Sequence, residues 1–140
     1  ALNGVISAQL GRIDALMQAA KVEAAARRDA SSIMLRDAVA KIIANAEGLD
    51  ETRLSQEIAL IAVKNDVTEE IDRLGAHLEA ARSLLIETGQ VGRKFDFLMQ
   101  EFMREANTLC SKSQSIALTR IGLDLKTVID QMREQVQNVE

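Results

Sequence analysis

The chain has 140 residues, enough for one domain with a buried core, and it carries a formal net charge of −4 at pH 7. It contains no Pro, Trp or Tyr, which favours long uninterrupted helices because a Pro inside a helix costs roughly 3 kcal/mol. The absence of any run of about 18 apolar residues excludes a transmembrane helix, and the charge excludes the bulk basic surface usual in nucleic-acid binders.

The first predicted helix covers about residues 2–46. Its apolar positions follow helical spacing, but a polar run interrupts them, which predicts a bend or a break. This run consists of Arg27, Arg28, Asp29, Ser31 and Ser32. The segment is less apolar after Lys21, so we expect residues 1–49 to form an arm that projects or that packs against another subunit. The apolar positions of this helix are Leu2, Ile6, Leu10, Ile13, Met17, Ala20, Ala24, Leu35, Val39 and Ile42.

A second helical segment follows, over about residues 51–88. Gly48 and Asp50 predict the end of the first helix and a new N-cap. Asp66 and Glu69 have the spacing of a capping box, which predicts that the segment splits near residue 65. Its apolar stripe has a heptad-like spacing and consists of Val67, Ile71, Leu74, Leu78, Ala81 and Leu85.

Two more helices complete the predicted fold. Residues 89–92 predict a turn, a third helix covers residues 92–112, and residues 111–115 predict another break. No segment alternates apolar and polar residues as a half-buried strand does. We therefore expect an all-α fold of long antiparallel helices that form hairpins or a bundle. The stripe of the last helix is Ile121, Leu125, Val128, Met132 and Val136.

The third helix has two different faces. One is an ordinary core stripe, whereas most of the other mixes carboxylates, amides, hydroxyls and cations, the groups that bind metals and phosphates. Phe97 points towards the polar side, where it contacts either a nucleic-acid base or another subunit. Cys110 lies towards the apolar side and is interpreted as a small core residue; a lone cysteine also fits a reducing cytoplasm. The core stripe is Phe95, Leu98, Met99, Phe102, Ala106 and Leu109.

A candidate metal site uses residues of two helices. Glu70 and His77 lie along one side of the second segment, and Glu101 and Glu105 lie four residues apart on the third helix. Such a pair of carboxylates repels unless a cation lies between them. Carboxylates with one imidazole suit Mg²⁺ or Mn²⁺ better than a structural zinc site. The alternative is that His77, the only histidine, is a solvent-facing or capping imidazole.

Cations and amides beside these carboxylates are candidate RNA or phosphate contacts. Arg104 lies between the two glutamates, where it forms either a bidentate clamp on a phosphate or a weak surface ion pair. Arg93 and Lys94 lie at the start of the third helix, where exposed amides favour anions. Asn107 and Lys112 approach its end and either bind the ligand or cap the helix.

Three segments resemble one known family. DVTEEIDRLGAH at residues 66–77, VGRKFDFLMQEFMREANTLCSK at residues 91–112 and DQMREQVQNVE at residues 130–140 are similar to the C-terminal helical region of the bacterial YicC/YloC family. The resemblance implies a cytoplasmic, divalent-metal-dependent endoribonuclease that assembles as a hexamer and has a further N-terminal domain. Residues 50–140 would then be the YicC-like region of a fragment that is nearly inactive alone.

The resemblance also suggests roles for the polar residues. The family's polar signature falls on Glu70, Arg73, His77, Arg93, Asp96, Gln100, Glu101, Arg104, Glu105, Asn107, Thr108, Ser111 and Lys112. On this basis a Mg²⁺ or Mn²⁺ ion is expected on Glu70, His77, Glu101 and Glu105, and catalysis on His77, Glu101, Arg104 and Glu105. RNA is expected on Arg73, Arg93, Lys94, Gln100, Asn107 and Lys112.

Two residues depart from the family pattern, and one alternative function stays open. Met103 stands where relatives commonly have Asn, and Cys110 where Gly or Ala is usual. The alternative is a structural helical module for oligomerisation, with catalysis residing wholly in an absent N-terminal domain. The two interpretations differ in geometry, since only the enzyme requires the histidine and the glutamates to converge.

Overall fold

The computed structural model describes residues 2–45, 48, 50–87, 92–113 and 115–139. Over these residues the chain forms helices and no strand, so the predicted all-α class is confirmed. None of the described helices is both long enough and apolar enough to cross a membrane. The helices are α1 (Leu2–Asn45), α2 (Glu51–Lys64), α3 (Thr68–Ile86), α4 (Gly92–Lys112) and α5 (Ile116–Val139).

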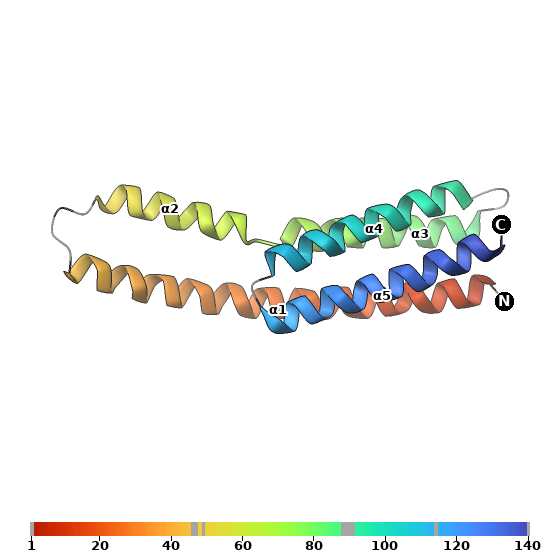
Figure 1. Cartoon of the computed structure of the whole chain (residues 1–140), viewed down its shortest axis with the longest axis horizontal. Helices are drawn as coiled ribbons and strands as arrows, with labels where there is room; N and C mark the ends of the chain where they lie inside the picture. The colour runs from red at the N-terminus through yellow and green to blue at the C-terminus, as the bar shows by residue number, and fades with distance from the viewer. Residues whose placement is uncertain (1, 46–47, 49, 88–91, 114, 140) are drawn as a thin grey trace.

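Four of the helices form an antiparallel bundle (Figure 1). α1 packs against α3 and α5, and α4 packs against the same two helices from the other side, so each helix has two neighbours. The core stripe predicted for the third helix is buried along its full length, with Phe102 completely enclosed. Burying such side chains, at about 25 cal/mol for each Å² of apolar surface, holds the bundle together.

α1 is one continuous helix of 44 residues, about 66 Å long. The predicted break near Arg27 is therefore wrong. The polar run contains neither Pro nor Gly, and Ala and Arg are good helix formers, so nothing there ends the helix. The interruption of the apolar stripe marks the end of the bundle: Ala24 is buried, whereas Ile42 is 45% exposed.

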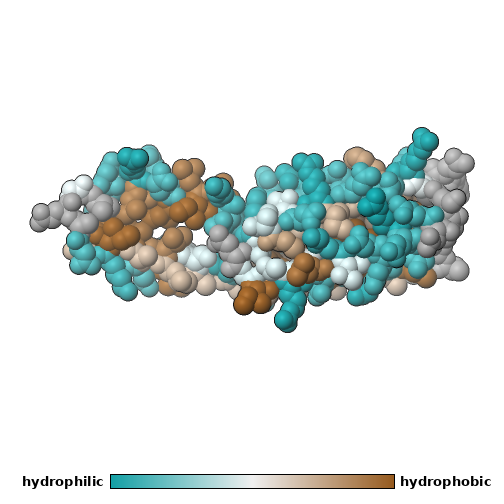
Figure 2. Space-filling model, viewed as in Figure 1, coloured by the Kyte–Doolittle hydropathy of each residue, from teal (hydrophilic) through white to brown (hydrophobic). Residues whose placement is uncertain are grey.

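Beyond Ala24, α1 runs beside α2 outside the bundle (Figure 1). We call residues 25–45 together with α2 the arm hairpin. α2 has no buried residue, and apolar side chains gather on the surface at this end of the molecule (Figure 2). The division of the chain at residue 49 stays a prediction. The large exposed apolar residues of the arm hairpin are Ile33, Met34, Ile42, Ile43, Leu60, Ile61 and Val63.

The ends of α2 follow the predicted signals. Gly48 has a φ of +77°, a conformation that glycine adopts without strain. The Asp50 carboxylate accepts hydrogen bonds from the amides of Thr52 at 3.1 Å and Arg53 at 3.3 Å, which confirms the N-cap. The split near residue 65 is also confirmed, since α2 ends at Lys64 and α3 begins at Thr68.

The capping box predicted for Asp66 and Glu69 does not form. α3 begins at Thr68, one residue later than such a box requires. The Asp66 carboxylate accepts instead from the amide of Thr68 at 3.0 Å and from its hydroxyl at 2.6 Å. The turn predicted at residues 89–92 lies outside the described residues, apart from Gly92, which opens α4. The break predicted at residues 111–115 is confirmed by the end of α4 at Lys112.

Candidate metal centre

Polar side chains of α3 and α4 meet along one edge of the line where the two helices pack. Because the helices are antiparallel, the start of α3 lies beside the end of α4. Lys112 Nζ lies 2.8 Å from Glu70 Oε1 at one end of this line, and Lys94 Nζ lies 3.6 Å from Glu87 Oε2 at the other. The candidate metal centre lies between these two ion pairs.

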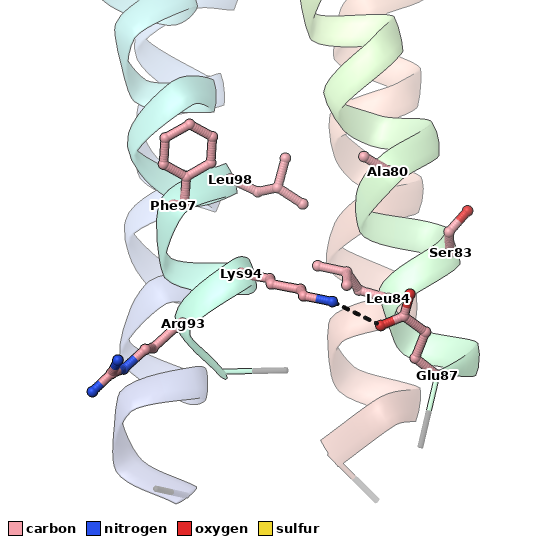
Figure 3. A pocket seen from close by; sticks show the side chains of 8 residues that line it. All are labelled: Ala80, Ser83, Leu84, Glu87, Arg93, Lys94, Phe97 and Leu98. Carbon is pink, nitrogen blue, oxygen red and sulfur yellow. Dashed lines mark ion pairs between the residues drawn. The ribbon is translucent and has the colours of Figure 1, made fainter. Parts of the chain in front are cut away.

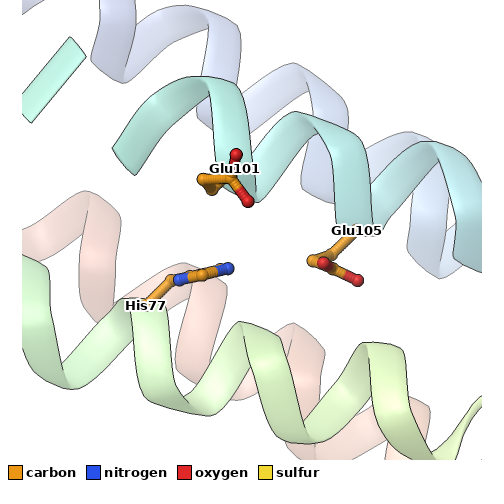
Figure 4. A group of neighbouring side chains, drawn as sticks. All are labelled: His77, Glu101 and Glu105. Atoms are coloured by element: carbon orange, nitrogen blue, oxygen red, sulfur yellow. The ribbon is translucent and has the colours of Figure 1, made fainter. Parts of the chain in front are cut away.

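His77, Glu101 and Glu105 converge at this centre. Each residue offers one ligand atom, and the three atoms all lie within 4.8 Å of one another. His77 extends from α3, with the tip of its ring directed towards the two carboxylates on α4 (Figure 4). Glu105 is only 3% exposed, and His77 and Glu101 are half-buried. The structure thus brings together three of the four residues predicted to bind the metal.

Helical spacing and one aromatic contact position these side chains. Glu101 and Glu105 are four residues apart, which places both on the same side of α4, one turn from each other. Phe102 is buried in the core beside them, and its ring meets that of His77 edge to face, with centroids 5.9 Å apart and planes at 76°. This geometry is typical of favourable aromatic pairs and limits rotation of the imidazole.

The donor atoms of the centre fit a divalent cation. The Nε2 atom of His77 is buried and has no hydrogen-bond partner among the described residues, although buried polar atoms are normally satisfied. Glu101 forms no ion pair within the described part of the chain, and it repels Glu105 across one helical turn. A Mg²⁺ or Mn²⁺ ion would satisfy the imidazole and offset this repulsion, and both ions accept oxygen-rich donor sets.

Arg73 partly neutralises the centre from its rim. Its Nη1 lies 3.7 Å from Glu105 Oε2, and its Nη2 lies 3.1 Å from Glu69 Oε2. The Arg73 side chain is 52% exposed, so solvent screens both interactions. One loosely held guanidinium shared between two carboxylates leaves the negative charge of Glu101 uncompensated. The excess charge favours a bound cation.

Glu70 lies away from the three converging residues. Glu70 is only 2% exposed. Its Oε1 accepts a hydrogen bond from Lys112, while its Oε2 has no hydrogen-bond partner among the described residues. The pair of Glu70 and Lys112 joins the start of α3 to the end of α4. The roles predicted for Glu70 in metal binding and for Lys112 in RNA binding stay predictions.

The remaining predicted RNA contacts lie mainly on an exposed stripe of α4, which we call the α4 ridge. Its members follow one another at steps of three or four residues, all are exposed, and none is a carboxylate. Arg93 and Arg104 form no ion pair with any described residue, whereas Gln100 Nε2 donates to Asp96 at 3.2 Å. The α4 ridge consists of Arg93, Phe97, Gln100, Arg104, Asn107 and Ser111.

The structure also shows a role for Arg27 that the sequence did not reveal. Its Nη1 donates to the carbonyls of Lys112, at 2.9 Å, and Ser113, and its Nη2 donates to the carbonyl of Asn65. Burial lowers the pKa of Arg27 below its ordinary value, while the nearby Asp66 carboxylate opposes that shift. The one signal in the sequence was the polar interruption of the apolar stripe at this position.

Comparison with known proteins identifies related sequences for most of the chain. The model of a family described as "Endoribonuclease YicC-like, C-terminal" matches residues 19–140. A "probable endoribonuclease YicC" of Haemophilus influenzae is 50% identical over 92 residues, which are 66% of this chain and 32% of the relative. A protein of the same name from Clostridioides difficile is 38% identical over 102 residues, 73% of this chain and 35% of the relative. The chain thus spans about a third of the length of these relatives.

Proposed function

The chain belongs to the YicC-like endoribonuclease family, and on this premise we propose that it is the helical C-terminal part of an enzyme that cleaves RNA phosphodiester bonds. The observation that carries the proposal is the convergence of His77, Glu101 and Glu105 between α3 and α4. A purely structural bundle gains nothing from two adjacent carboxylates and an unpartnered imidazole, because unsatisfied polar groups cost stability.

Metal dependence is part of this proposal. His77, Glu101 and Glu105 would hold a Mg²⁺ or Mn²⁺ ion. When bound, such an ion supplies positive charge to a phosphate oxygen and lowers the pKa of water. Glu70 would support the site indirectly, because its hydrogen bond to Lys112 fixes the start of α3 against the end of α4. Arg73 would balance the charge of Glu105 from the rim.

The cations of α4 would bind the RNA backbone. Arg104 follows Glu101 by three residues and precedes Glu105 directly, so its side chain leaves the helix beside the centre, on the exposed side of α4. A guanidinium can bind a phosphate through two parallel hydrogen bonds, and such donors stabilise charge that develops in the transition state. Arg93, Gln100 and Asn107 continue the same exposed side and would hold neighbouring nucleotides.

His77 would have one of two roles at the centre. Its Nε2 can bind the cation, or it can accept a proton from the attacking oxygen and return one to the leaving oxygen. A single nitrogen cannot do both in the same step. If His77 is the proton carrier, the pH–rate profile of the complete enzyme shows an ionisation that disappears in the His77→Gln variant, whereas loss of Mn²⁺ affinity in that variant indicates the ligand role.

Substitution in the complete protein tests the function. His77→Ala and Glu105→Ala are each expected to lower the rate of RNA cleavage with Mn²⁺ by about 10²-fold or more. Glu79→Ala is the matched control, because Glu79 is exposed on α3 and lies outside the centre. Unchanged rates for both His77→Ala and Glu105→Ala would remove these residues from the mechanism. The present chain alone is expected to cleave RNA weakly or not at all.

Self-association belongs to the same proposal. The complete protein would be a cytoplasmic homo-oligomer, a hexamer by its resemblance to the family. The exposed apolar residues of the arm hairpin support this assembly, since patches of this kind commonly mark protein interfaces. They also favour the alternative function, a structural module for oligomerisation. Cleavage that survives substitution of the whole metal centre would support that alternative.

A further inference from the structure

A pocket lies between the end of α3 and the start of α4, beyond the candidate metal centre. It is a shallow, open depression with a volume of about 550 Å³, not an enclosed cavity that surrounds a small ligand. Leu84 of α3 and Leu98 of α4 line its apolar part, and Ser83 lies at its edge with its hydroxyl directed away from α4 (Figure 3). No residue of this pocket belongs to the metal centre.

Phe97 is the unusual residue of this pocket. The residue is 61% exposed, whereas the other two phenylalanines of the chain, Phe95 and Phe102, are buried. Phe97 lies on the α4 ridge, one turn beyond Arg93 and one turn before Glu101. An aromatic face that remains in water beside cations and amides is the usual platform for an unpaired base.

The charges around Phe97 suit a nucleotide. Arg93 and Phe97 lie on the same flank of α4, while Lys94 and Leu98 extend towards α3 (Figure 3). Arg93 forms no ion pair with any described residue. Lys94 pairs with Glu87 at 3.6 Å, but both side chains are about half exposed or more, so little energy opposes an exchange of Glu87 for a phosphate. The two cations outnumber the one carboxylate that lines the pocket.

The pocket lies close to the centre along the same helix. Phe97 precedes Glu101 by four residues, which is about 6 Å of helix. A base stacked on Phe97 would therefore belong to a nucleotide next to the phosphate at the metal centre. Stacking requires a base that is not held in a duplex, because paired bases are enclosed by their neighbours.

We propose that this pocket is a base-binding subsite: an unpaired base of the RNA stacks on Phe97, and its phosphate binds Arg93 and Lys94. This inference rests on the proposed function and deepens it, since it makes unpaired RNA the substrate class. The subsite accepts any base, because stacking depends on the aromatic face and not on a particular hydrogen-bond pattern.

The test measures RNA binding apart from cleavage. The complete protein is titrated in EDTA with a fluorescent single-stranded oligonucleotide and with a duplex of the same length. Phe97→Ala is expected to weaken binding of the single strand about tenfold, equal to about 1.4 kcal/mol, and to change duplex binding less than twofold. Phe97→Tyr keeps the aromatic face and should bind as the wild type does. Ile116→Ala is the control, since Ile116 is another exposed apolar residue, 85% exposed, on α5.

The possible results separate this inference from the proposed function. Equal binding by Phe97→Ala and wild type, or equal weakening for single strand and duplex, would overturn the subsite. A change of oligomeric state in Phe97→Ala, measured by light scattering, would also overturn it and would indicate a subunit contact. Cleavage with Mn²⁺ is measured in parallel: if the wild type cleaves while Phe97→Ala binds normally, the function stands without the subsite. Selective weakening without any cleavage by the wild type would support a base-binding site in a protein that is not a nuclease.

Discussion

Lys112 donates a hydrogen bond of 2.8 Å to Glu70, and this contact joins the last residue of α4 to the first turn of α3. The Glu70 side chain is 2% exposed, whereas that of Lys112 is 31% exposed. A buried carboxylate that loses its cation is left with an uncompensated charge, which costs more than the intact pair contributes.

Lys112→Met is therefore expected to destabilise the chain by about 2–3 kcal/mol, somewhat less than for a fully enclosed pair because Lys112 reaches water. Glu70→Gln combined with Lys112→Met should recover at least half of that loss, since no buried charge then remains. Urea unfolding, followed by circular dichroism, measures the stability of the two single variants and of the double variant. If the double variant is as unstable as the sum of the two single variants, the ion pair is not the cause.

Arg27 joins the ends of two helices to the middle of a third. Its guanidinium donates to carbonyls at the end of α2 and at the end of α4, where unpaired carbonyls and the helix dipole favour a cation. Arg27→Ala should destabilise the chain by about 2–4 kcal/mol, because several charge-assisted hydrogen bonds are lost. Arg27→Lys should recover only part of this, since an ammonium lacks the planar fork of a guanidinium.

Arg28→Ala is the matched control for Arg27. Arg28 is exposed, and it donates to the Thr68 hydroxyl at 3.2 Å. We expect a change of no more than about 0.5 kcal/mol in the same urea experiment. Equal effects of the two alanine substitutions would show that Arg27 acts as an ordinary surface cation.

Asp66 makes stability depend on pH at the start of α3. Hydrogen bonds from the side chain and the backbone of Thr68 hold the pKa of Asp66 below its unfolded value of 3.8. The folded state therefore binds the proton less readily than the unfolded state does. The stabilisation is complete above the unfolded pKa, and it is lost as the pH falls through the folded pKa.

Asp66→Ala should accordingly cost about 1 kcal/mol at pH 7, because the hydrogen bonds from the amide and the hydroxyl of Thr68 are lost. The difference between variant and wild type should shrink as the pH falls below about 4. Thermal unfolding measured between pH 7 and pH 2.5 tests this. A difference that stays constant over the whole range would contradict the proposed linkage.

Gly122 of α5 lies against Cys110 of α4. A methyl group added at Gly122 would overlap the Cys110 sulfur atom and would lie 3.7 Å from the carbonyl oxygen of Ala106. Gly122→Ala should therefore destabilise the wild type by about 1 kcal/mol, despite the better helix propensity of alanine. In a Cys110→Ala background the overlap is absent, and the same substitution should stabilise the chain by up to about 1 kcal/mol. A double-mutant cycle in urea tests this coupling, and additive effects would contradict it.

Much of the fold was predictable because hydrophobic periodicity records which side of a helix is buried. The stripe that ends with Leu109 on α4 is buried as predicted, and so is that from Ile6 to Ala24 on α1. The same reasoning failed at Arg27, since periodicity cannot distinguish a helix that stops from a helix that leaves the bundle. Only the structure shows that α1 continues as part of the arm hairpin.

The candidate site was predictable at the level of residue types and spacing, but not of partners. Glu101 and Glu105 lie on one side of α4 because of their spacing alone. The register of α3 against α4 decides which residues of α3 meet them, and that register depends on the packing of the whole core. For this reason Glu70 could not be distinguished from His77 in the sequence, although the structure pairs Glu70 with Lys112 and directs His77 towards the two carboxylates.

The central claim is that His77, Glu101 and Glu105 hold a divalent cation. Calorimetric titration of Mn²⁺ into the complete protein and into its variant carrying both Glu101→Gln and Glu105→Gln tests it most directly. We predict one saturable site per chain in the wild type and its loss in the variant, with the helical circular dichroism of the two proteins unchanged. Equal Mn²⁺ binding by both proteins, or no saturable binding by the wild type, would contradict the claim.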